Sequence, residues 1–165
     1  QDVESIDVEV DSMTPRLLIH DRPSAGLEAK FSMPFCAAAA VVDGQVGIGT
    51  FEADRVQAPA IRALMPKVSM RVNPEFDTTP PLSHARVTIR LRDGRVLIQA
   101  AAGARGYPAR PASEDQLRVK FVECAGRALS SGAEHVWEAL STIEDIHDMA
   151  SFGELFDPAL QGSVS

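Results

Sequence analysis

A row of arginines is the clearest cluster of chemically active side chains in this sequence. Arg86, Arg90, Arg92 and Arg95 fall in and beside a run of alternating apolar and polar residues, which places them on one face of a predicted sheet. Arginine binds carboxylates through paired hydrogen bonds, so this row could hold a polycarboxylate. Such a row is also typical of a solvated sheet face or of a salt-bridge surface between subunits.

The other residue types that commonly do chemistry form no known motif. The four histidines are His20, His84, His135 and His147, and none of them belongs to an HxH, HExxH or Cys/His set. The acidic pairs Glu114–Asp115 and Glu144–Asp145 fall in a helix first turn and on a polar helix face. No G-x-S-x-G sequence is present. We therefore expect no metal, no cofactor and no catalytic residue within this chain.

The stretch 29–44, AKFSMPFCAAAAVVDG, predicts a helix whose first turn could face a pocket. Ser32 can cap the amides at the start of the helix, and Pro34 is tolerated in its first turn. Gly44 can end the helix in the left-handed conformation. Four consecutive alanines would let another backbone pack closely against this helix.

The remaining patterns predict the elements that must position these residues. The expected strands are 3–10, 17–19, 68–72, 85–91 and 96–100, and the expected helices are 33–42, 59–65, 113–129 and 133–148. This order favours an α+β fold, a two-layer sandwich in which an antiparallel sheet has helices packed on one face. We expect one domain over residues 1–157 and a loose tail over 158–165.

Asp93–Gly94 lies between two alternating runs and predicts a hairpin with a type I′ turn. One face of this hairpin should bury aliphatic side chains, and the other should show the arginines.

Composition narrows the classes of partner and compartment. The formal net charge is −7, which disfavours binding to nucleic acid. No apolar run approaches the length of a membrane helix. Cys36 and Cys124 are expected to be reduced, as in a cytoplasmic protein. Because the chain opens on Gln1 within strand-like sequence, we expect it to be a fragment of a longer protein.

Three segments, taken in order, resemble the C-terminal domain of the MmgE/PrpD family. They are the run 29–44, the helix and strand at 58–72, and the region 85–121, in which a strand and a DG turn precede GYPARPAS, Leu117 and Lys120-Phe121. The resemblance covers residues 1 to about 150, and its specificity lies in the combined order of the segments.

The resemblance implies a lid domain that follows a large helical domain, with the active site between the two. Family members act as homodimers without metal on small di- or tricarboxylic acids. They remove a proton next to a carboxylate, and dehydration (as in 2-methylcitrate dehydratase), decarboxylation or epimerisation follows. The N-terminal helical domain carries most of the reacting groups, so we expect the isolated chain to be inactive. The alternative is a noncatalytic binding or dimerisation module. The apolar helices near 60–65 and 136–146 also favour a dimer.

The resemblance places one functional residue of the family inside this chain, at Phe35, and we name Phe35, Ser32 and Lys30 as the candidate substrate-binding residues. Phe35 matches the tyrosine that closes the family's "FSlpY" turn, and Phe35 has no hydroxyl that could donate a proton. Ser32 and Lys30 belong to the same turn. From the residues alone, the favoured interpretation is that Phe35 is a core aromatic, Ser32 a helix cap and Lys30 a solvated cation.

Overall fold

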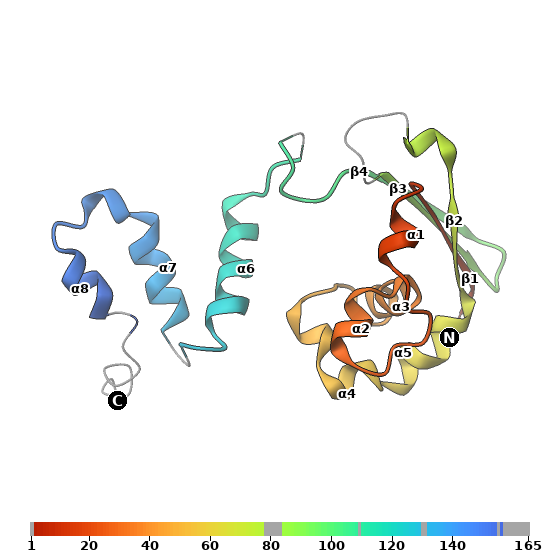
Figure 1. The fold of residues 1–165 in the computed structure, drawn as a ribbon, viewed down its shortest axis with the longest axis horizontal. Coiled ribbons are helices and arrows are strands. Elements are labelled where there is room, and N and C mark those ends of the chain that lie inside the picture. The colour runs from red at the N-terminus through yellow and green to blue at the C-terminus, as the bar shows by residue number, and fades with distance from the viewer. Residues whose placement is uncertain (1, 78–83, 109, 130–131, 155, 157–165) are drawn as a thin grey trace. The chain divides into compact units, whose positions relative to one another are not determined.

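Four strands form one mixed sheet in the order β2-β1-β3-β4 (Figure 1). The computed structural model describes residues 2–77, 84–108, 110–129, 132–154 and 156, so the predicted tail 158–165 lies outside the described residues. The strands are β1 (Val3–Val10), β2 (Val68–Val72), β3 (His84–Leu91) and β4 (Val96–Ala102). The chain divides into two compact units, Gln1–Arg110 and Pro111–Ser165, and the whole sheet belongs to the first.

The predicted α+β class is confirmed, but the sheet is not wholly antiparallel. β1 pairs antiparallel with β3, and β3 pairs antiparallel with β4, whereas β1 and β2 run parallel. A parallel pair needs a long crossover, and residues 11–67 supply one. This crossover contains α1 (Thr14–Leu17), α2 (Gly26–Lys30), α3 (Met33–Asp43), α4 (Ala53–Val56) and α5 (Pro59–Leu64), with 3-10 helices η1 (Ile48–Phe51) and η2 (Met65–Lys67).

The strand predicted at 17–19 is wrong, because α1 occupies the start of that segment. A carboxylate oxygen of Asp11 accepts hydrogen bonds from the backbone N–H groups of Met13 and Thr14, at 2.9 and 2.8 Å. This arrangement satisfies amides that would otherwise be unpaired at a helix start, and so it favours a helical turn.

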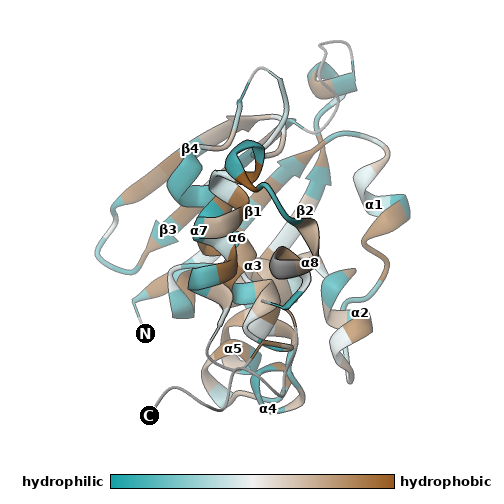
Figure 2. Ribbon diagram, turned by 90° about the vertical axis from the view of Figure 1, so that its left-hand side faces the viewer, coloured by the Kyte–Doolittle hydropathy of each residue, from teal (hydrophilic) through white to brown (hydrophobic). Residues whose placement is uncertain are grey.

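The helices of the first unit cover the apolar face of the sheet. Ile6, Val8 and Val10 are almost fully buried there, with Met33 and Ala37 of α3 packed against them. A second cluster joins α3 to α5 and includes Phe35, Ala38, Ala39, Val56, Ile61 and Met65. The predicted alternation is visible along the sheet as bands of apolar and polar residues (Figure 2).

The β3–β4 hairpin has a three-residue loop in place of the predicted two-residue turn. The Gly94 N–H donates to the Leu91 carbonyl at 3.0 Å, and the Leu91 N–H donates to the Arg95 carbonyl at 2.9 Å. Gly94 has φ 86°, which suits a turn followed by a bulge. The extra residue shifts the register, so Val96 and Ile98 lie opposite Arg90 and Thr88 on the polar face of the sheet.

The regular elements in the described part of the second unit are helices. α6 (Glu114–Ala125) begins at the predicted capping box, where the N–H of Gln116 donates to Ser113 Oγ at 3.3 Å. α7 (Ala133–Ser141) packs against α6 through Phe121 and Trp137, whose ring centroids are 5.5 Å apart. The 3-10 helix η4 (Ile143–Asp145) and α8 (Met149–Glu154) follow. No helix among the described residues combines the length and apolar character needed to cross a bilayer.

Candidate functional site

The junction between α2 and α3 contains all three residues that the sequence singled out. Ser32 caps α3: its side-chain oxygen accepts from the Phe35 N–H at 3.2 Å, and its carbonyl accepts from the Cys36 N–H at 3.0 Å. The predicted cap, the proline in the first turn and the left-handed Gly44 are all present. Ser32 has no exposed surface, so its described role is to hold the start of α3.

Phe35 lies in the core beneath the junction. The side chain is fully buried, and its ring packs on Phe51 of η1 with centroids 6.0 Å apart. Lys30 lies on the outer side of Phe51, with its Nζ 5.8 Å from the centroid of the Phe51 ring. Phe51 thus links Lys30 to Phe35. Of the three predicted residues, Lys30 is the one whose polar group reaches the surface of the described chain.

A glycine allows Phe51 to hold this position. A Cβ placed on Gly26, at the start of α2, would overlap the Phe51 carbonyl oxygen. The close approach of these two backbones seats the Phe51 ring between Lys30 and Phe35.

A cleft of about 460 Å³ opens beside the first turn of α3. It is lined by Asp21, Arg22, Pro34, Arg62, Met65, Pro66 and Val68. Arg62 Nη1 donates to the Pro23 carbonyl at 2.8 Å, which fixes the guanidinium at the cleft wall. A guanidinium has five N–H donors, so Arg62 and Arg22 together offer cationic donors suited to a carboxylate.

The sequence contained no signal for this cleft. Arg62 falls in an ordinary helical run, and its backbone partner lies 39 residues earlier in the chain. Arg62 lies beside Pro23 because the 20–25 loop packs on α5. No local sequence pattern encodes this packing.

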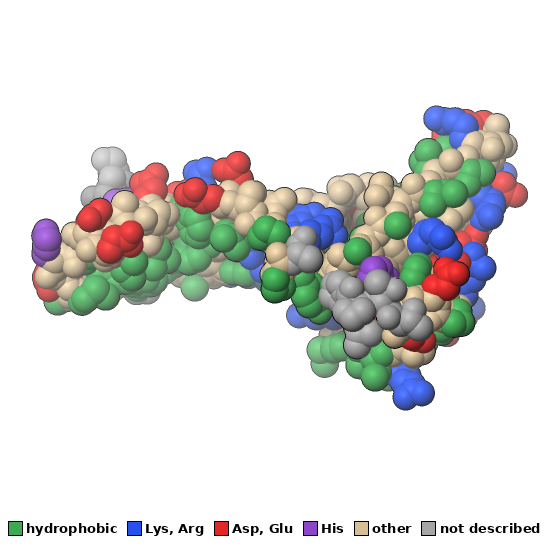
Figure 3. Space-filling model, turned by 90° about the horizontal axis from the view of Figure 1, so that it is seen from above, with side chains coloured by type: hydrophobic (Ala, Val, Ile, Leu, Met, Phe, Trp, Pro, Cys, Tyr) green, Lys and Arg blue, Asp and Glu red, His purple; other side chains and the backbone are tan. Residues whose placement is uncertain are grey.

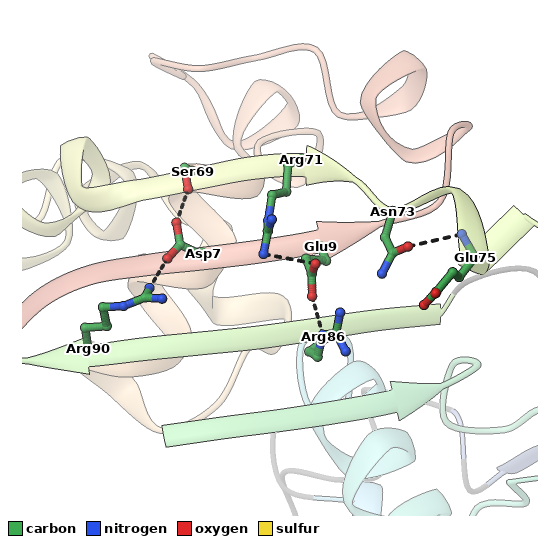
Figure 4. Close-up of polar contacts among 8 residues, drawn as sticks. All are labelled: Asp7, Glu9, Ser69, Arg71, Asn73, Glu75, Arg86 and Arg90. Carbon is green, nitrogen blue, oxygen red and sulfur yellow. Dashed lines mark hydrogen bonds and ion pairs between the residues drawn. The ribbon is translucent and has the colours of Figure 1, made fainter. Parts of the chain in front are cut away.

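The predicted arginine row forms ion pairs within the sheet (Figure 4). Glu9 pairs with Arg86 and, at 3.0 Å, with Arg71, while Asp7 pairs with Arg90 and accepts from Ser69 Oγ at 2.6 Å. In addition, Arg95 pairs with Asp93 at 2.7 Å, and the Arg86 guanidinium lies 5.9 Å from the Phe76 ring centroid.

Three of the four arginines are therefore engaged by carboxylates of this chain. Acidic and basic side chains are accordingly intermixed on the surface of the first unit (Figure 3). Among the described residues, the row has the character of an internal salt-bridge network more than that of a polycarboxylate site.

These contacts change the acidity of both carboxyl groups. The hydrogen bond from Arg86 holds the pKa of Glu9 below its ordinary value, and the nearby charge of Arg71 acts in the same direction. The hydrogen bond from Ser69, followed by that from Arg90, lowers the pKa of Asp7. A lowered pKa means that the ionised carboxylate stabilises the folded state.

Glu9→Gln is expected to destabilise the first unit at neutral pH, because it removes the charge that Arg71 and Arg86 share. A carboxyl with a lowered pKa contributes stability above its ordinary pKa of 4.5, and this contribution is lost as pH falls through the folded-state pKa. The difference between wild type and variant in free energy of unfolding should therefore be largest near about pH 7 and shrink by about pH 3. Urea denaturation at both pH values measures it. A difference that stays constant with pH would contradict the network.

The thiol of Cys36 is a poor nucleophile. Burial raises the pKa of Cys36 to about 11, and Sγ lies 3.5 Å from the Ala29 carbonyl oxygen. Within the described ranges, no group of three or more His, Cys, Asp and Glu side chains is placed to hold a metal ion.

Comparison with known proteins identifies the class. The family model for the MmgE/PrpD C-terminal domain matches residues 1–145, and the chain belongs to this family. Its similar curated relatives include the cis-aconitate decarboxylase of Mus musculus, 26% identical over 145 residues, which are 87% of this chain and 30% of the relative. The Homo sapiens cis-aconitate decarboxylase is 24% identical over 127 residues, covering 76% of this chain and 26% of the relative.

A fungal relative extends the same pattern. The cis-aconitate decarboxylase-like protein oryM of Aspergillus oryzae is 24% identical over 135 residues, 82% of this chain and 27% of the relative. The chain thus spans less than a third of the length of the curated relatives that it matches.

Proposed function

We propose that this chain is the lid domain of a cofactor-independent lyase or isomerase that acts on a small di- or tricarboxylic acid. The full protein would abstract a proton next to a carboxylate, with the cavity completed by an N-terminal helical domain that supplies the base and most of the carboxylate-binding groups. We expect the full protein to be a cytoplasmic homodimer.

The family match over residues 1–145 is the observation that carries this proposal. The geometry of the junction agrees with it. Ser32 and Phe35 fix the start of α3 from inside the core, while Lys30 and the cleft with Arg22 and Arg62 lie at the surface beside it. Cations placed there could orient a carboxylate that reacts with groups on another domain.

The reaction we favour is dehydration of a 2-methylcitrate-like substrate. Phe35 stands where the family motif has tyrosine, and it lacks a hydroxyl that could protonate an intermediate. Its full burial gives it a packing role in this chain. The relatives named as cis-aconitate decarboxylases make cis-aconitate the second substrate to test.

The 165-residue chain should turn over neither 2-methylcitrate nor cis-aconitate. Chromatographic assay of each acid, with the chain shown to be folded by circular dichroism, tests this expectation. The chain's failure to act separates a lid from a self-sufficient enzyme, and clear turnover by the chain alone would overturn the lid assignment. A noncatalytic binding or dimerisation module would also leave the acids unchanged, so the full reading frame must be assayed beside the chain.

A further inference from the structure

The two edge strands of the sheet differ greatly in how well they are protected against pairing with a further strand. β2, at one edge, has five residues, carries an arginine whose side chain is 65% exposed, and is flanked by Pro66 and Pro74. Short length, exposed charge and flanking prolines all discourage pairing with another strand. β4, at the other edge, has seven residues with the sequence VLIQAAA, without charge or proline.

Large apolar side chains of β4 are exposed on both faces of the sheet. Val96 is 50%, Leu97 is 52% and Ile98 is 63% exposed. An uncharged, exposed edge strand of this length is a template for pairing with a further strand.

The hydrogen bonds of the hairpin define which backbone groups face outward. Because Leu91 N–H donates to the Arg95 carbonyl, the alternation of an antiparallel ladder directs the backbone groups of Leu97, Gln99 and Ala101 toward β3. The groups of Val96, Ile98, Ala100 and Ala102 therefore point away from the sheet. The carbonyl of Ala100 accepts from the side-chain Nε2 of Gln99 on its own strand, at 2.9 Å.

We propose that β4 pairs antiparallel with β4 of a second copy of this chain across a twofold axis at Gln99. In this register Ile98 of each copy lies opposite Ala100 of the other, and Val96 lies opposite Ala102. All four outward-facing residues of each strand then exchange backbone hydrogen bonds.

The charge pattern fits a second copy as the partner. The uncharged run extends from Val96 to Ala104, so Arg95 of one copy falls opposite the uncharged Gly103 of the other and no like charges face each other. Apolar side chains meet apolar side chains on both faces, except at the axis, where the uncharged Gln99 of one copy lies opposite Gln99 of the other. The pairing consumes the same edge in both copies, so it closes at a dimer and does not propagate. It is independent of the proposed chemistry.

The test uses a matched pair of variants. Ile98→Pro removes an outward N–H while leaving the hydrogen bonds to β3 intact, whereas Ile98→Ala shortens the same side chain and keeps the N–H. Sedimentation equilibrium of the 165-residue chain should show a concentration-dependent dimer. Ile98→Pro should raise its dissociation constant by about tenfold or more relative to Ile98→Ala, because each dimer loses two backbone hydrogen bonds.

Three outcomes would overturn the proposal, provided that thermal melts show both variants to be folded. They are a wild-type chain that is monomeric up to near-millimolar concentration, a wild-type chain that forms open-ended polymers, and a dimer that Ile98→Pro and Ile98→Ala affect equally. The turnover assays of the proposed function bear on none of these outcomes, so each proposal can fail separately.

Discussion

Phe35→Ala is expected to destabilise the first unit by about 3–5 kcal/mol, the range for removing a buried aromatic ring. The ring has no exposed surface and packs on Phe51 in the cluster that joins α3 to α5. Its loss leaves a cavity in this cluster. The start of α3 and the neighbouring cleft should loosen with it.

Phe31→Ala is the matched control for this variant. Phe31 lies four residues earlier in the same junction, but its side chain is 44% exposed, so its removal should cost clearly less. Trp137 belongs to the other unit, and its fluorescence would therefore report the wrong part of the chain. Hydrogen exchange of peptides from residues 1–110 follows the correct unit. Equal losses of protection in the two variants would contradict the buried position of Phe35.

Gly26→Ala should cost about 3 kcal/mol, toward the upper end of the range for overpacking. The added Cβ would meet a backbone carbonyl, which cannot rotate away as the end of a flexible side chain can. We expect η1 to shift, carrying Phe51 away from both Lys30 and Phe35.

Gly49→Ala provides the comparison within the same region. A Cβ at Gly49 meets nothing within 4 Å, and we expect a change of about 0.5 kcal/mol or less. Urea denaturation followed by far-ultraviolet circular dichroism measures both variants. A Gly26→Ala variant as stable as Gly49→Ala would show that α2 and η1 are not held in contact.

Local sequence signals predicted the elements whose causes are local. The cap at Ser32, the stop at Gly44 and the capping box at Ser113 all depend on residues a few positions apart, and all three were confirmed. The alternation in β1 and β3 also identified the buried face correctly, because one face of each strand contacts the helices.

Features that depend on distant parts of the chain were missed. The parallel pairing of β2 with β1 depends on how residues 11–67 cross the sheet, and alternation within β2 is the same for either direction. Asp93–Gly94 supports both a two-residue and a three-residue loop, and the choice of the longer loop moved Val96 and Ile98 to the polar face. To predict that carboxylates neutralise charges of the arginine row, one would have to know that Asp7 and Glu9 lie beside it.

The turn that contains the candidate site was predictable from the sequence, but the surroundings of its side chains were not. The sequence placed Lys30, Ser32 and Phe35 in one turn, and the structure gives Lys30 and Phe35 a shared neighbour, Phe51. The sequence could not show that the Ser32 and Phe35 side chains point inward, or that Arg62 reaches the adjacent cleft. Both features depend on packing between segments far apart in the chain.

Hydrogen exchange into substrate in deuterated water tests the central claim most directly. Decarboxylation and epimerisation both return a solvent proton to carbon, so deuterium should appear in the product. Dehydration forms an alkene without a new C–H bond, so it is detected as loss of water and labels the remaining substrate only where the abstracted proton exchanges with solvent and returns. The protein expressed from the complete reading frame that contains this chain should dehydrate 2-methylcitrate or convert or label cis-aconitate, as seen by nuclear magnetic resonance, while the 165-residue chain neither converts nor labels either acid. Conversion or labelling by the chain alone, or neither conversion nor labelling of either acid by the folded complete protein, would contradict the account.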